Sequence, residues 1–407
     1  MTPHELDAVD PLARFRERFI LPEGVIYLDG NSLGPLPRAT VDAVARTVTN
    51  EWGEGLIGSW TGAGWVEAPG RIGDKIARLI GAEPGEVVAC DSTSVNAFKA
   101  LAAALSLNPG RATILSERGN FPTDVYMIEG LAALSGGAIQ MRLVDPEALE
   151  AAIDEDTAAV LVTQVNYKTG RIRDMAETTR IAHAKGAVTI WDLSHSAGSI
   201  PVALNEARAD LAIGCGYKFL NGGPGAPAWI YVAQRHQGAA HPALTGWFGH
   251  ARPFDFADEY EPAEGIARFQ CGTPAVLGLA ALECGVDGLL EADMADLRAK
   301  AVALGELFVR AMAPLCEPHG FVLASPADSA LRASQISYAH PDAYAIVQAL
   351  IARGVIGDFR APDILRFGLT PLTLRHADVA RSVEILGEVM ERGEWDRAEY
   401  RTRKAVT

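Results

Sequence analysis

The spacing of apolar and polar positions differs between two parts of the chain, and it changes near residue 256. Between residues 87 and 232, short apolar runs alternate with longer amphipathic segments. The predicted strands span residues 87–90, 113–115, 138–143, 159–163, 188–192, 211–213 and 228–232. Helical patterns, such as those at 95–107 and 176–185, separate most of them. Apolar strands that alternate with helices predict a doubly wound, mostly parallel α/β sheet with helices on both faces.

Outside this region the pattern predicts shorter strands and longer helices. A stripe of apolar residues, which includes Leu297, Leu304 and Phe308, indicates an amphipathic helix over residues 292–312. Further predicted elements are strands near 321–323 and 335–338, a helix between Asp342 as N-cap and Gly354 as its end, and a last helix over 378–392. Toward the N-terminus, the pattern predicts helices over 7–19 and 37–51 and a strand over 25–28. The C-terminal part therefore reads as a smaller α+β domain.

The length of 407 residues exceeds what one hydrophobic core usually holds, so two domains are expected. We assign residues 46–260 to a large domain and residues 261–407 to a small C-terminal domain. Residues 1–45 form an N-terminal segment that is expected to pack with the small domain. The composition, 49% hydrophobic and 21% charged, is typical of a globular protein.

The net charge narrows the class of partner. It is formally −15, and no basic cluster offsets it. Such a surface and the phosphates of nucleic acids or anionic membranes would repel each other, so neither is an expected partner. A small molecule is the expected partner. No apolar run approaches the roughly 20 residues that span a bilayer, and the first residues lack the pattern of a signal peptide.

Cysteine usage indicates a reducing compartment. Five cysteines are scattered without metal-type spacing, at positions 90, 215, 271, 284 and 316. Reduced thiols and a cytoplasmic location are therefore expected, and no metal site is predicted.

Lys218 is the first candidate for chemistry. It lies within the run GCGYKFLNGGPG over residues 214–225, just past a predicted strand. A lysine with a depressed pKa can form a Schiff base with a carbonyl, such as that of pyridoxal phosphate. The surrounding glycines would let a bulky ligand approach the backbone. The alternative is an ordinary solvated lysine in a surface loop.

Other strand ends carry residues that fit the same cofactor, because ligands of parallel sheets sit at the carboxyl ends of the strands. Hydroxyls in DSTSVN over 91–96 open a helix, where free N–H groups bind phosphate, although N-caps are the alternative. Asp192 would pair with a protonated pyridine nitrogen, or else cap the next helix. His195 is a further candidate for contact with the cofactor ring or the phosphate. Phe121 could stack on the ring, and Thr163 could donate a hydrogen bond to its phenolic oxygen.

Several longer motifs resemble the kynureninases, pyridoxal phosphate enzymes with the aminotransferase-like fold called fold type I. The matching segments are LDGNSLG at 28–34, FPTD at 121–124, DLSH at 192–195, YKFLNGGPG at 217–225, GWFGH at 246–250 and GTP at 272–274. The resemblance covers nearly the whole chain. It implies the hydrolytic Cβ–Cγ cleavage of L-kynurenine, or of 3-hydroxykynurenine, to anthranilate or 3-hydroxyanthranilate and L-alanine in tryptophan catabolism.

The resemblance also implies a set of site residues. Lys218, Tyr217 and Asp192 would be catalytic: Lys218 would bind the cofactor and remove the α-proton, Asp192 would pair with the pyridine nitrogen, and Tyr217 would relay protons. The cofactor-binding residues would be Thr93, Ser94, Phe121, Asp124, Thr163, Asp192, His195, Tyr217, Lys218, Trp247 and Thr273.

The assembly and the substrate contacts follow from the same resemblance. Trp247 and Thr273 are expected to reach the phosphate from the neighbouring subunit, so the active sites would lie at the interface of a homodimer. Arg366 would bind the substrate α-carboxylate through its planar fork of donors, with a surface arginine as the alternative. Ser32 and Trp60 are further expected substrate contacts.

Two other functions compete with this interpretation. One is another fold type I activity, such as a cysteine desulfurase-like lyase or an aminotransferase, although Cys215 and Cys271 lie within the motifs and look unsuited to a mobile loop. The other is a binding or scaffold protein without activity. Retention of Lys218, Asp192 and Arg366 argues against the scaffold.

Overall fold

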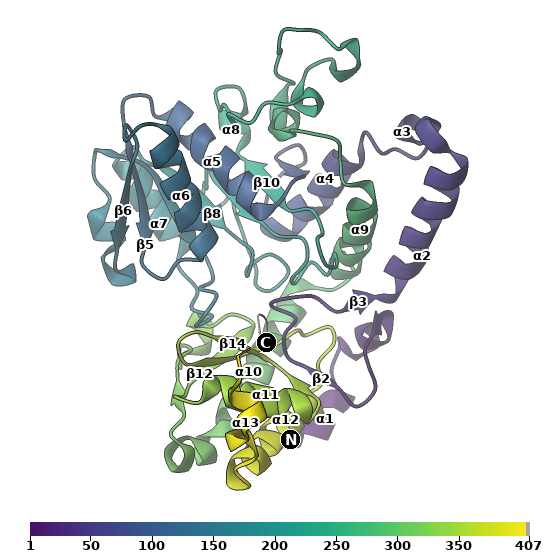
Figure 1. The fold of residues 1–407 in the computed structure, drawn as a ribbon, viewed down its shortest axis with the longest axis vertical. Coiled ribbons are helices and arrows are strands. Elements are labelled where there is room, and N and C mark those ends of the chain that lie inside the picture. The colour runs from purple at the N-terminus through teal and green to yellow at the C-terminus, as the bar shows by residue number, and fades with distance from the viewer. Residues whose placement is uncertain (404–407) are drawn as a thin grey trace.

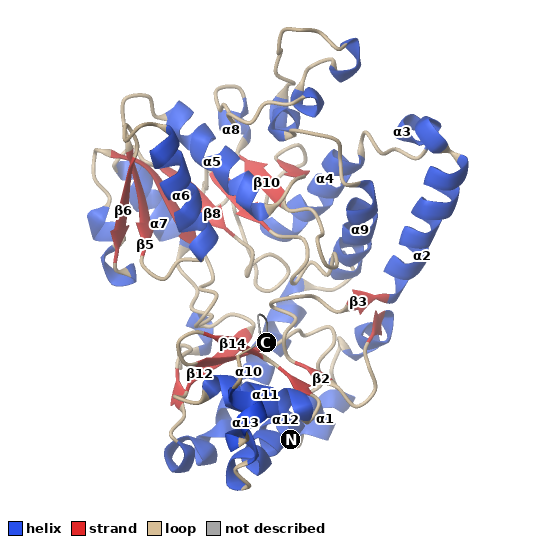
Figure 2. Cartoon of the chain, viewed as in Figure 1, coloured by secondary structure: helices blue, strands red, loops and turns tan. Residues whose placement is uncertain are grey.

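The computed structural model describes residues 1–403, and its largest element is a seven-stranded sheet (Figures 1 and 2). The strand order is β4-β10-β9-β8-β7-β5-β6. The strands are β4 (Val87–Ala89), β5 (Thr113–Glu117), β6 (Gln140–Val144), β7 (Thr157–Thr163), β8 (Val188–Asp192), β9 (Leu211–Gly214) and β10 (Trp229–Val232). Only β10 runs antiparallel to its neighbours within this sheet. The predicted strands and the mostly parallel sheet are confirmed.

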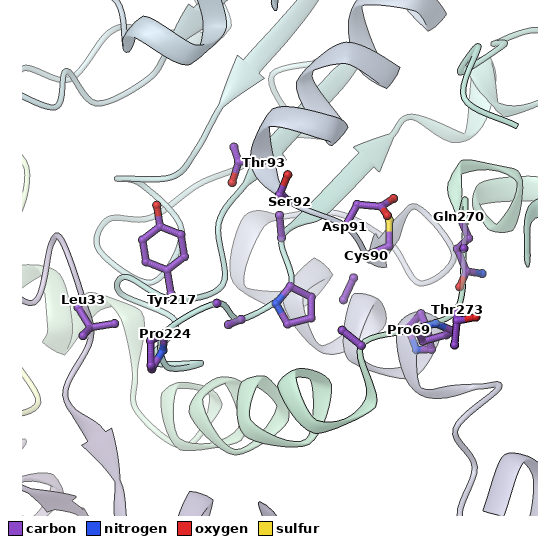
Figure 3. Close-up of a pocket in the computed structure, with 18 of the residues that line it drawn as sticks. Leu33, Pro69, Cys90, Asp91, Ser92, Thr93, Tyr217, Pro224, Gln270 and Thr273 are labelled. Carbon is purple, nitrogen blue, oxygen red and sulfur yellow. The ribbon is translucent and has the colours of Figure 1, made fainter. Parts of the chain in front are cut away.

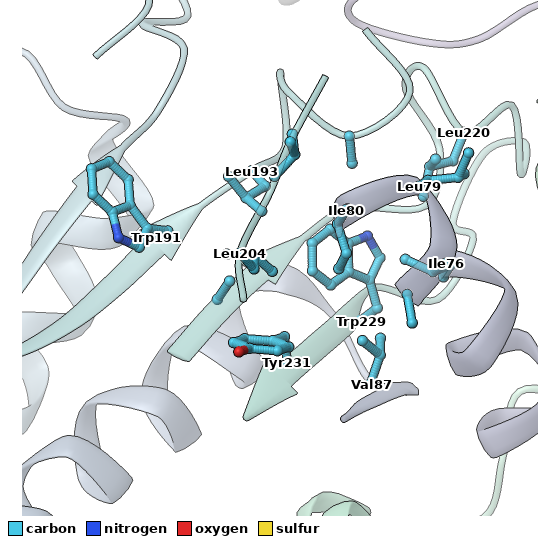
Figure 4. Packing of buried hydrophobic residues seen from close by; sticks show 14 of the residues in the cluster. Ile76, Leu79, Ile80, Val87, Trp191, Leu193, Leu204, Leu220, Trp229 and Tyr231 are labelled. Atoms are coloured by element: carbon cyan, nitrogen blue, oxygen red, sulfur yellow. The ribbon is translucent and has the colours of Figure 1, made fainter. Parts of the chain in front are cut away.

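Both faces of this sheet are buried, which explains why its strands read as continuous apolar runs. Along β10, Trp229 and Tyr231 belong to the hydrophobic cluster on one face, and Ile230 and Val232 belong to the cluster on the other. Figure 4 shows the first cluster, where Trp229 packs among side chains from several elements. Because successive side chains of a strand point to opposite faces, an apolar residue is needed at every position.

Helices cover the two faces. They are α4 (Ala68–Ile80), α5 (Thr93–Leu107), α6 (Pro122–Leu134), α7 (Met175–Ala184), α8 (Gln234–Gln237) and α9 (Val276–Leu290). Short 3-10 helices occur as η4 (Pro146–Ala148), η5 (Glu150–Ala152), η6 (Trp247–Gly249), η7 (Pro253–Asp255) and η8 (Gly265–Phe269). Apolar residues of α4, α7 and α9 fill one cluster, and those of α5 and α6 fill the other.

A second, antiparallel sheet lies in the C-terminal part, in the order β11-β12-β15-β14. Its strands are β11 (Val322–Leu323), β12 (Gln335–Ala339), β14 (Asp358–Arg360) and β15 (Ile364–Gly368). Its helices are α10 (Met294–His319), η9 (Ser329–Leu331), α11 (Ala343–Ala352), α12 (His376–Glu391), η10 (Glu394–Asp396) and α13 (Ala398–Arg401). Helix α10 contributes Leu297 to the core of the large sheet and Phe308 to that of the small sheet, so it joins the two.

The N-terminal segment differs from its prediction at one helix. Its elements are α1 (Pro3–Ala8), η1 (Ala13–Arg18), β1 (Phe19–Ile20), β2 (Ile26–Tyr27), β3 (Leu36–Pro37) and most of α2 (Arg38–Arg46). The π-helix η2 (Thr47–Glu54), η3 (Leu56–Gly58) and α3 (Ser59–Gly62) follow within the range assigned to the large domain. The single helix predicted over 7–19 is wrong. Pro11 lies in its middle, where proline lacks the N–H that a helix requires, and Asp10 instead accepts a hydrogen bond from the Leu12 N–H. Leu12 and Phe15 are nevertheless buried in the large core.

The proposed domain boundaries remain a proposal. Strand β2 pairs with β13 (Val355–Ile356), which ties the N-terminal segment to the C-terminal part, while Leu12 and Phe15 of the same segment lie in the large core. Helix α9, however, packs against α4 of the large part, although its residues fall within the range assigned to the small domain. Across residues 1–403, no helix has the length and apolar character needed to cross a membrane.

Candidate active site

Lys218 and His195 meet at the carboxyl ends of two adjacent strands. Lys218 follows β9 and His195 follows β8, and these strands are paired in parallel. The lysine is only 8% exposed, and its Nζ lies 2.9 Å from Nε2 of His195. Burial, and then the charges of Lys218 and Arg366, lower the pKa of His195 well below its ordinary value. The imidazole is therefore neutral, and the surface-loop interpretation of Lys218 is wrong.

Two buried carboxylates stand beside this pair. Asp192 ends β8 and accepts a hydrogen bond from the backbone N–H of Ser194 at 2.7 Å. Asp124 lies in the first turn of α6. Burial, and then the charge of Asp192, raise the pKa of Asp124 well above its ordinary value.

Several buried polar atoms around Lys218 lack partners. Within residues 1–403, neither carboxylate oxygen of Asp124 nor Nδ1 of His195 makes a hydrogen bond of normal geometry. An unpaired buried polar atom costs about 1–3 kcal/mol, so such a cluster is typical of a site that a polar ligand completes. A protonated pyridine ring, which offers a positively charged N–H, suits these carboxylates. The donor set therefore fits pyridoxal phosphate.

Aromatic rings surround the lysine. The Lys218 ammonium lies 5.6 Å from the ring centroid of Phe121 and 5.8 Å from that of Tyr217. Tyr167 contacts Phe121 edge-on, with ring centroids 5.3 Å apart. Thr163, at the end of β7, donates to the side chain of Asn120. The structure thus gathers most of the predicted residues that follow β5, β7, β8 and β9.

A cavity of about 540 Å³ adjoins this group. Its lining includes Ser32, Thr93, Tyr217 and Thr273 (Figure 3). Figure 3 shows Tyr217 toward one end of the cavity and Thr273 toward the other. Thr93 begins α5 and lines the cavity, with Ser94 next in the same turn, and the N–H groups of a first helical turn are of the kind that can stabilise an anion. The N-cap itself is Ser92, which accepts from the backbone N–H of Val95, so capping and cavity lining occur together.

Arg366 lies on the central part of the small sheet, and its surroundings are different. It is 1% exposed, so the surface-arginine interpretation is wrong. Its Nε donates to Asp358 at 2.8 Å, its Nη1 to the Tyr167 carbonyl at 2.7 Å and its Nη2 to the Ser32 hydroxyl at 2.6 Å. Nη2 also binds the second oxygen of Asp358. Arg366 therefore links the N-terminal loop, the large domain and the small sheet.

Sequence reasoning missed the partners of Arg366. Asp358 and Arg366 are directly opposite in the register of β14 and β15, and Arg360 shares the Asp358 carboxylate. Burial, and then Asp358, raise the pKa of the nearby Asp29 to about 7. The only signal was the Asp-x-Arg spacing in a short strand, and the sequence does not state which strand that segment pairs with.

A buried lysine was missed as well. Lys99 in α5 is fully buried, and its Nζ donates to Asp91 at 2.7 Å and to the Phe269 carbonyl at 2.5 Å. Asp91 precedes the start of α5, and Phe269 precedes the segment that carries Thr273. Lys99 therefore ties together two segments that line the cavity.

Trp60 and Trp247 lie in a separate aromatic group. The Trp60 ring centroid is 6.4 Å from that of Trp247 and 5.7 Å from that of Phe248. No ring contact or hydrogen bond joins this group to Lys218 or Arg366 within the part of the chain that the structure describes. In a single chain, these two predicted contacts are thus grouped with each other and not with the lysine.

Family models match two parts of the chain. A model described as "Kynureninase C-terminal domain" matches residues 297–386, and one described as "DegT/DnrJ/EryC1/StrS aminotransferase family" matches residues 70–202. Curated relatives match almost the full length. The kynureninase of Pseudomonas fluorescens is 50% identical, and that of Burkholderia pseudomallei (strain 1106a) is 49% identical, each covering 99% of this chain and 98% of the relative.

Solved structures share the fold at low identity. A mutant of C-DES with glycine covalently linked to its PLP cofactor has a TM-score of 0.79 and 19% identity, with 92% of this chain and 99% of that chain covered. A cysteine desulfurase from Thermococcus onnurineus NA1 has a TM-score of 0.78 and 18% identity, with 93% and 98% covered. The fold type I architecture expected from the sequence is confirmed.

Proposed function

The chain belongs to the kynureninase family, and from that premise we propose which of its residues carry out the reaction. The activity is a pyridoxal phosphate-dependent hydrolysis of the Cβ–Cγ bond of L-kynurenine, which yields anthranilate and L-alanine. The alternatives of a cysteine desulfurase-like lyase or an aminotransferase are not favoured, because the relatives near 50% identity are kynureninases. The observation that carries the residue assignment is the buried Lys218, surrounded by unpartnered polar atoms.

We assign the cofactor to the ends of the large sheet. Lys218 would hold it through Nζ, and Asp192 and Asp124 would face its ring nitrogen. Phe121 would stack on the ring, and the start of α5, with Thr93 and Ser94, would bind the phosphate. When bound, pyridoxal phosphate supplies an electron sink for negative charge at the substrate α-carbon. Thr163, His195 and Tyr217 remain proposed cofactor contacts.

The protein groups then hold the substrate and move protons. Arg366 would bind the α-carboxylate through Nη1 and Nη2, because Asp358 occupies Nε and one donor of Nη2, and the carboxylate would share or displace the contact of Nη1 with the Tyr167 carbonyl. Ser32 Oγ now lies on Nη2, so the carboxylate would share or displace that contact. Lys218 Nζ takes the α-proton and becomes positively charged. His195 beside it stays neutral, so it places no second positive charge next to the lysine. Tyr217, which lines the cavity, returns a proton to the alanine product.

Substitution of Lys218 and of Arg366 tests this assignment. We expect Lys218→Ala to lose the visible absorption band of the bound cofactor and to release anthranilate at least about 10³-fold more slowly. Arg366→Ala should keep the band and raise KM. If Lys218→Ala keeps the band shape and still releases anthranilate, the assignment is wrong. Side-by-side assays of kynurenine and 3-hydroxykynurenine would establish which substrate is preferred.

We further propose a homodimer in the cytoplasm, with Trp247 and Thr273 completing the neighbour's site. The support is an exposed aromatic group near η6 and η7, where Phe254 is 52% and Phe256 is 77% exposed. Apolar surface of this kind is typical of protein interfaces. Free cysteines at all five positions suit a reducing compartment.

Subunit mixing tests the shared site. Lys218→Ala and Trp247→Ala would each be impaired, and mixed dimers would contain one site with both native residues. Partial recovery of anthranilate release on mixing supports a site built from two subunits. A monomeric mass in light scattering would contradict the dimer.

A further inference from the structure

One carboxylate at the substrate end of the site is shared by two guanidinium groups. Asp358 binds Arg366 through both oxygens. Arg360 donates from Nη2 to the same carboxylate at 2.6 Å, and the Ser32 hydroxyl donates to it at 2.9 Å. The carboxylate is 2% exposed, and Arg360 is 35% exposed. Arg366 and Asp358 are therefore a buried pair, and Arg360 is a third, less buried member.

The net charge of Arg366, Asp358 and Arg360 together indicates what Arg360 contributes to the site. Arg366 and Asp358 by themselves form a neutral pair, which offers an incoming carboxylate hydrogen bonds but no net charge. Arg360 makes the group of three net positive by one, and the nearby Asp29, whose pKa burial and Asp358 raise to about 7, offsets that charge only in part near neutral pH. Because charge interactions strengthen in a poorly solvated site, that remaining charge matters most at the point where the substrate carboxylate binds.

Three observations place Arg360 at the site and not merely at a sheet edge. Its Nη2 also contacts Ser32 Oγ at 3.1 Å, the same hydroxyl that contacts Arg366. Its charge contributes to lowering the pKa of His195, so it is felt on the Lys218 side. Its Nε is buried without an acceptor within residues 1–403, which leaves one donor unused.

We propose that Arg360 is a positioning residue for carboxylate recognition: by sharing Asp358 with Arg366, it leaves Arg366 with net charge to bind the substrate α-carboxylate. The inference rests on the proposed role of Arg366 and deepens it. Arg360 would raise the affinity for amino acids that keep their carboxylate, with little effect on the steps that follow binding.

The test compares ligands with and without a carboxylate in the holoenzyme. We expect Arg360→Gln to raise KM for kynurenine about tenfold, with kcat within about twofold. Inhibition by the amine analogue of kynurenine, which lacks the α-carboxylate, should stay within about twofold. Arg360→Lys keeps the charge and should recover most of the affinity. A role in folding alone would weaken both ligands equally, and that result would overturn the proposal.

A double variant separates charge from structure. Asp358→Asn in the Arg360→Gln background removes one negative charge and restores a net charge of plus one, so KM should fall partway back. A double variant worse than both single variants would contradict the charge argument. Arg353→Gln is the control, because it removes a similarly half-buried guanidinium that pairs with carboxylates elsewhere, Glu388 on α12 and Glu394 on η10.

Failure of the proposed function would look different. If the parent enzyme released no anthranilate from kynurenine, the reaction assignment would be wrong. The Arg360 proposal would still be tested by the absorbance change of the holoenzyme with L-alanine and with ethylamine. Only the response to L-alanine should weaken in Arg360→Gln, and an equal loss for both amines would overturn the inference.

Discussion

Around Lys218 the buried polar atoms of Asp124 and His195 lack partners, whereas Arg366 itself is paired through all three of its nitrogens, although Arg360 Nε and Asp29 Oδ1 near it also lack partners within residues 1–403. Asp124 and His195 leave oxygen and nitrogen atoms without a hydrogen bond of normal geometry within residues 1–403. Arg366 and Asp358, by contrast, are joined through two contacts and share Ser32. The difference indicates that one region is completed by its ligand and that the other is organised before the ligand arrives.

The physical reason follows from what each region is proposed to bind. A cofactor that stays bound can supply the missing hydrogen bonds, so the protein keeps buried polar atoms unpaired at a cost in stability. A substrate carboxylate binds and leaves in each turnover. Between turnovers, an unpaired buried guanidinium would lower the stability of the protein. Asp358 removes that cost and holds the planar fork in position.

The largest effect that would break this comparison comes from Asp358→Ala. It leaves the buried Arg366 without its carboxylate, so the free energy of unfolding should fall by about 3–5 kcal/mol in a urea titration. Glu388→Ala is the control, since its pairs with Arg353 and Arg381 are partly exposed and should contribute about 1 kcal/mol or less. Equal losses in the two variants would show that Arg366 does not depend on its partner.

A smaller effect is expected on the unpaired side, from Asp124→Asn. The cofactor-free protein should keep its stability, because the substitution removes a buried carboxyl whose pKa burial and Asp192 have raised. Cofactor affinity should fall about tenfold, roughly 1.4 kcal/mol, measured by absorbance titration. Asp174→Asn, at the N-cap of α7, is the control and should change neither quantity. A marked loss of stability without cofactor would mean that Asp124 is structural.

The smallest expected effect is on the pH dependence of stability, and it concerns Asp29, which lies near Asp358 on the Arg366 side. Its pKa is raised to about 7 by burial and by Asp358, so the folded protein binds this proton more tightly than the unfolded chain does. The contribution to stability is complete below about pH 4, the ordinary range of an aspartate, and is lost as the pH rises through about 7.

Unfolding measurements at several pH values check this sign. Asp29→Asn should remove a decline of about 1 kcal/mol between pH 6 and 8. Asp358, whose pKa Arg366 lowers against the effect of burial, acts in the opposite direction, since its contribution is lost as the pH falls below about 4. An unchanged pH profile in Asp29→Asn would contradict the assignment.

The parts of the fold that the sequence predicted share one property. Apart from the edge strand β6, the strands of the large sheet are buried on both faces, so they appear as mostly apolar runs, and glycines and hydroxyls mark where they end. Those marks located Lys218, Asp192 and Thr93. The helix over 7–19 was wrong, because its apolar spacing continued across Pro11.

What the sequence determined by itself was the mostly parallel sheet, the lysine beyond β9 and, through its motifs, the family. Only the tertiary structure decided which polar groups meet. Asp358 faces Arg366 through the register of β14 and β15, and Ser32 reaches them from a loop more than 300 positions away. Pairing between distant segments depends on strand register and domain packing, to which local periodicity carries no information. The assignment of Lys218 needed both the sequence and the structure, because the motifs point to this residue and the structure shows that it is buried.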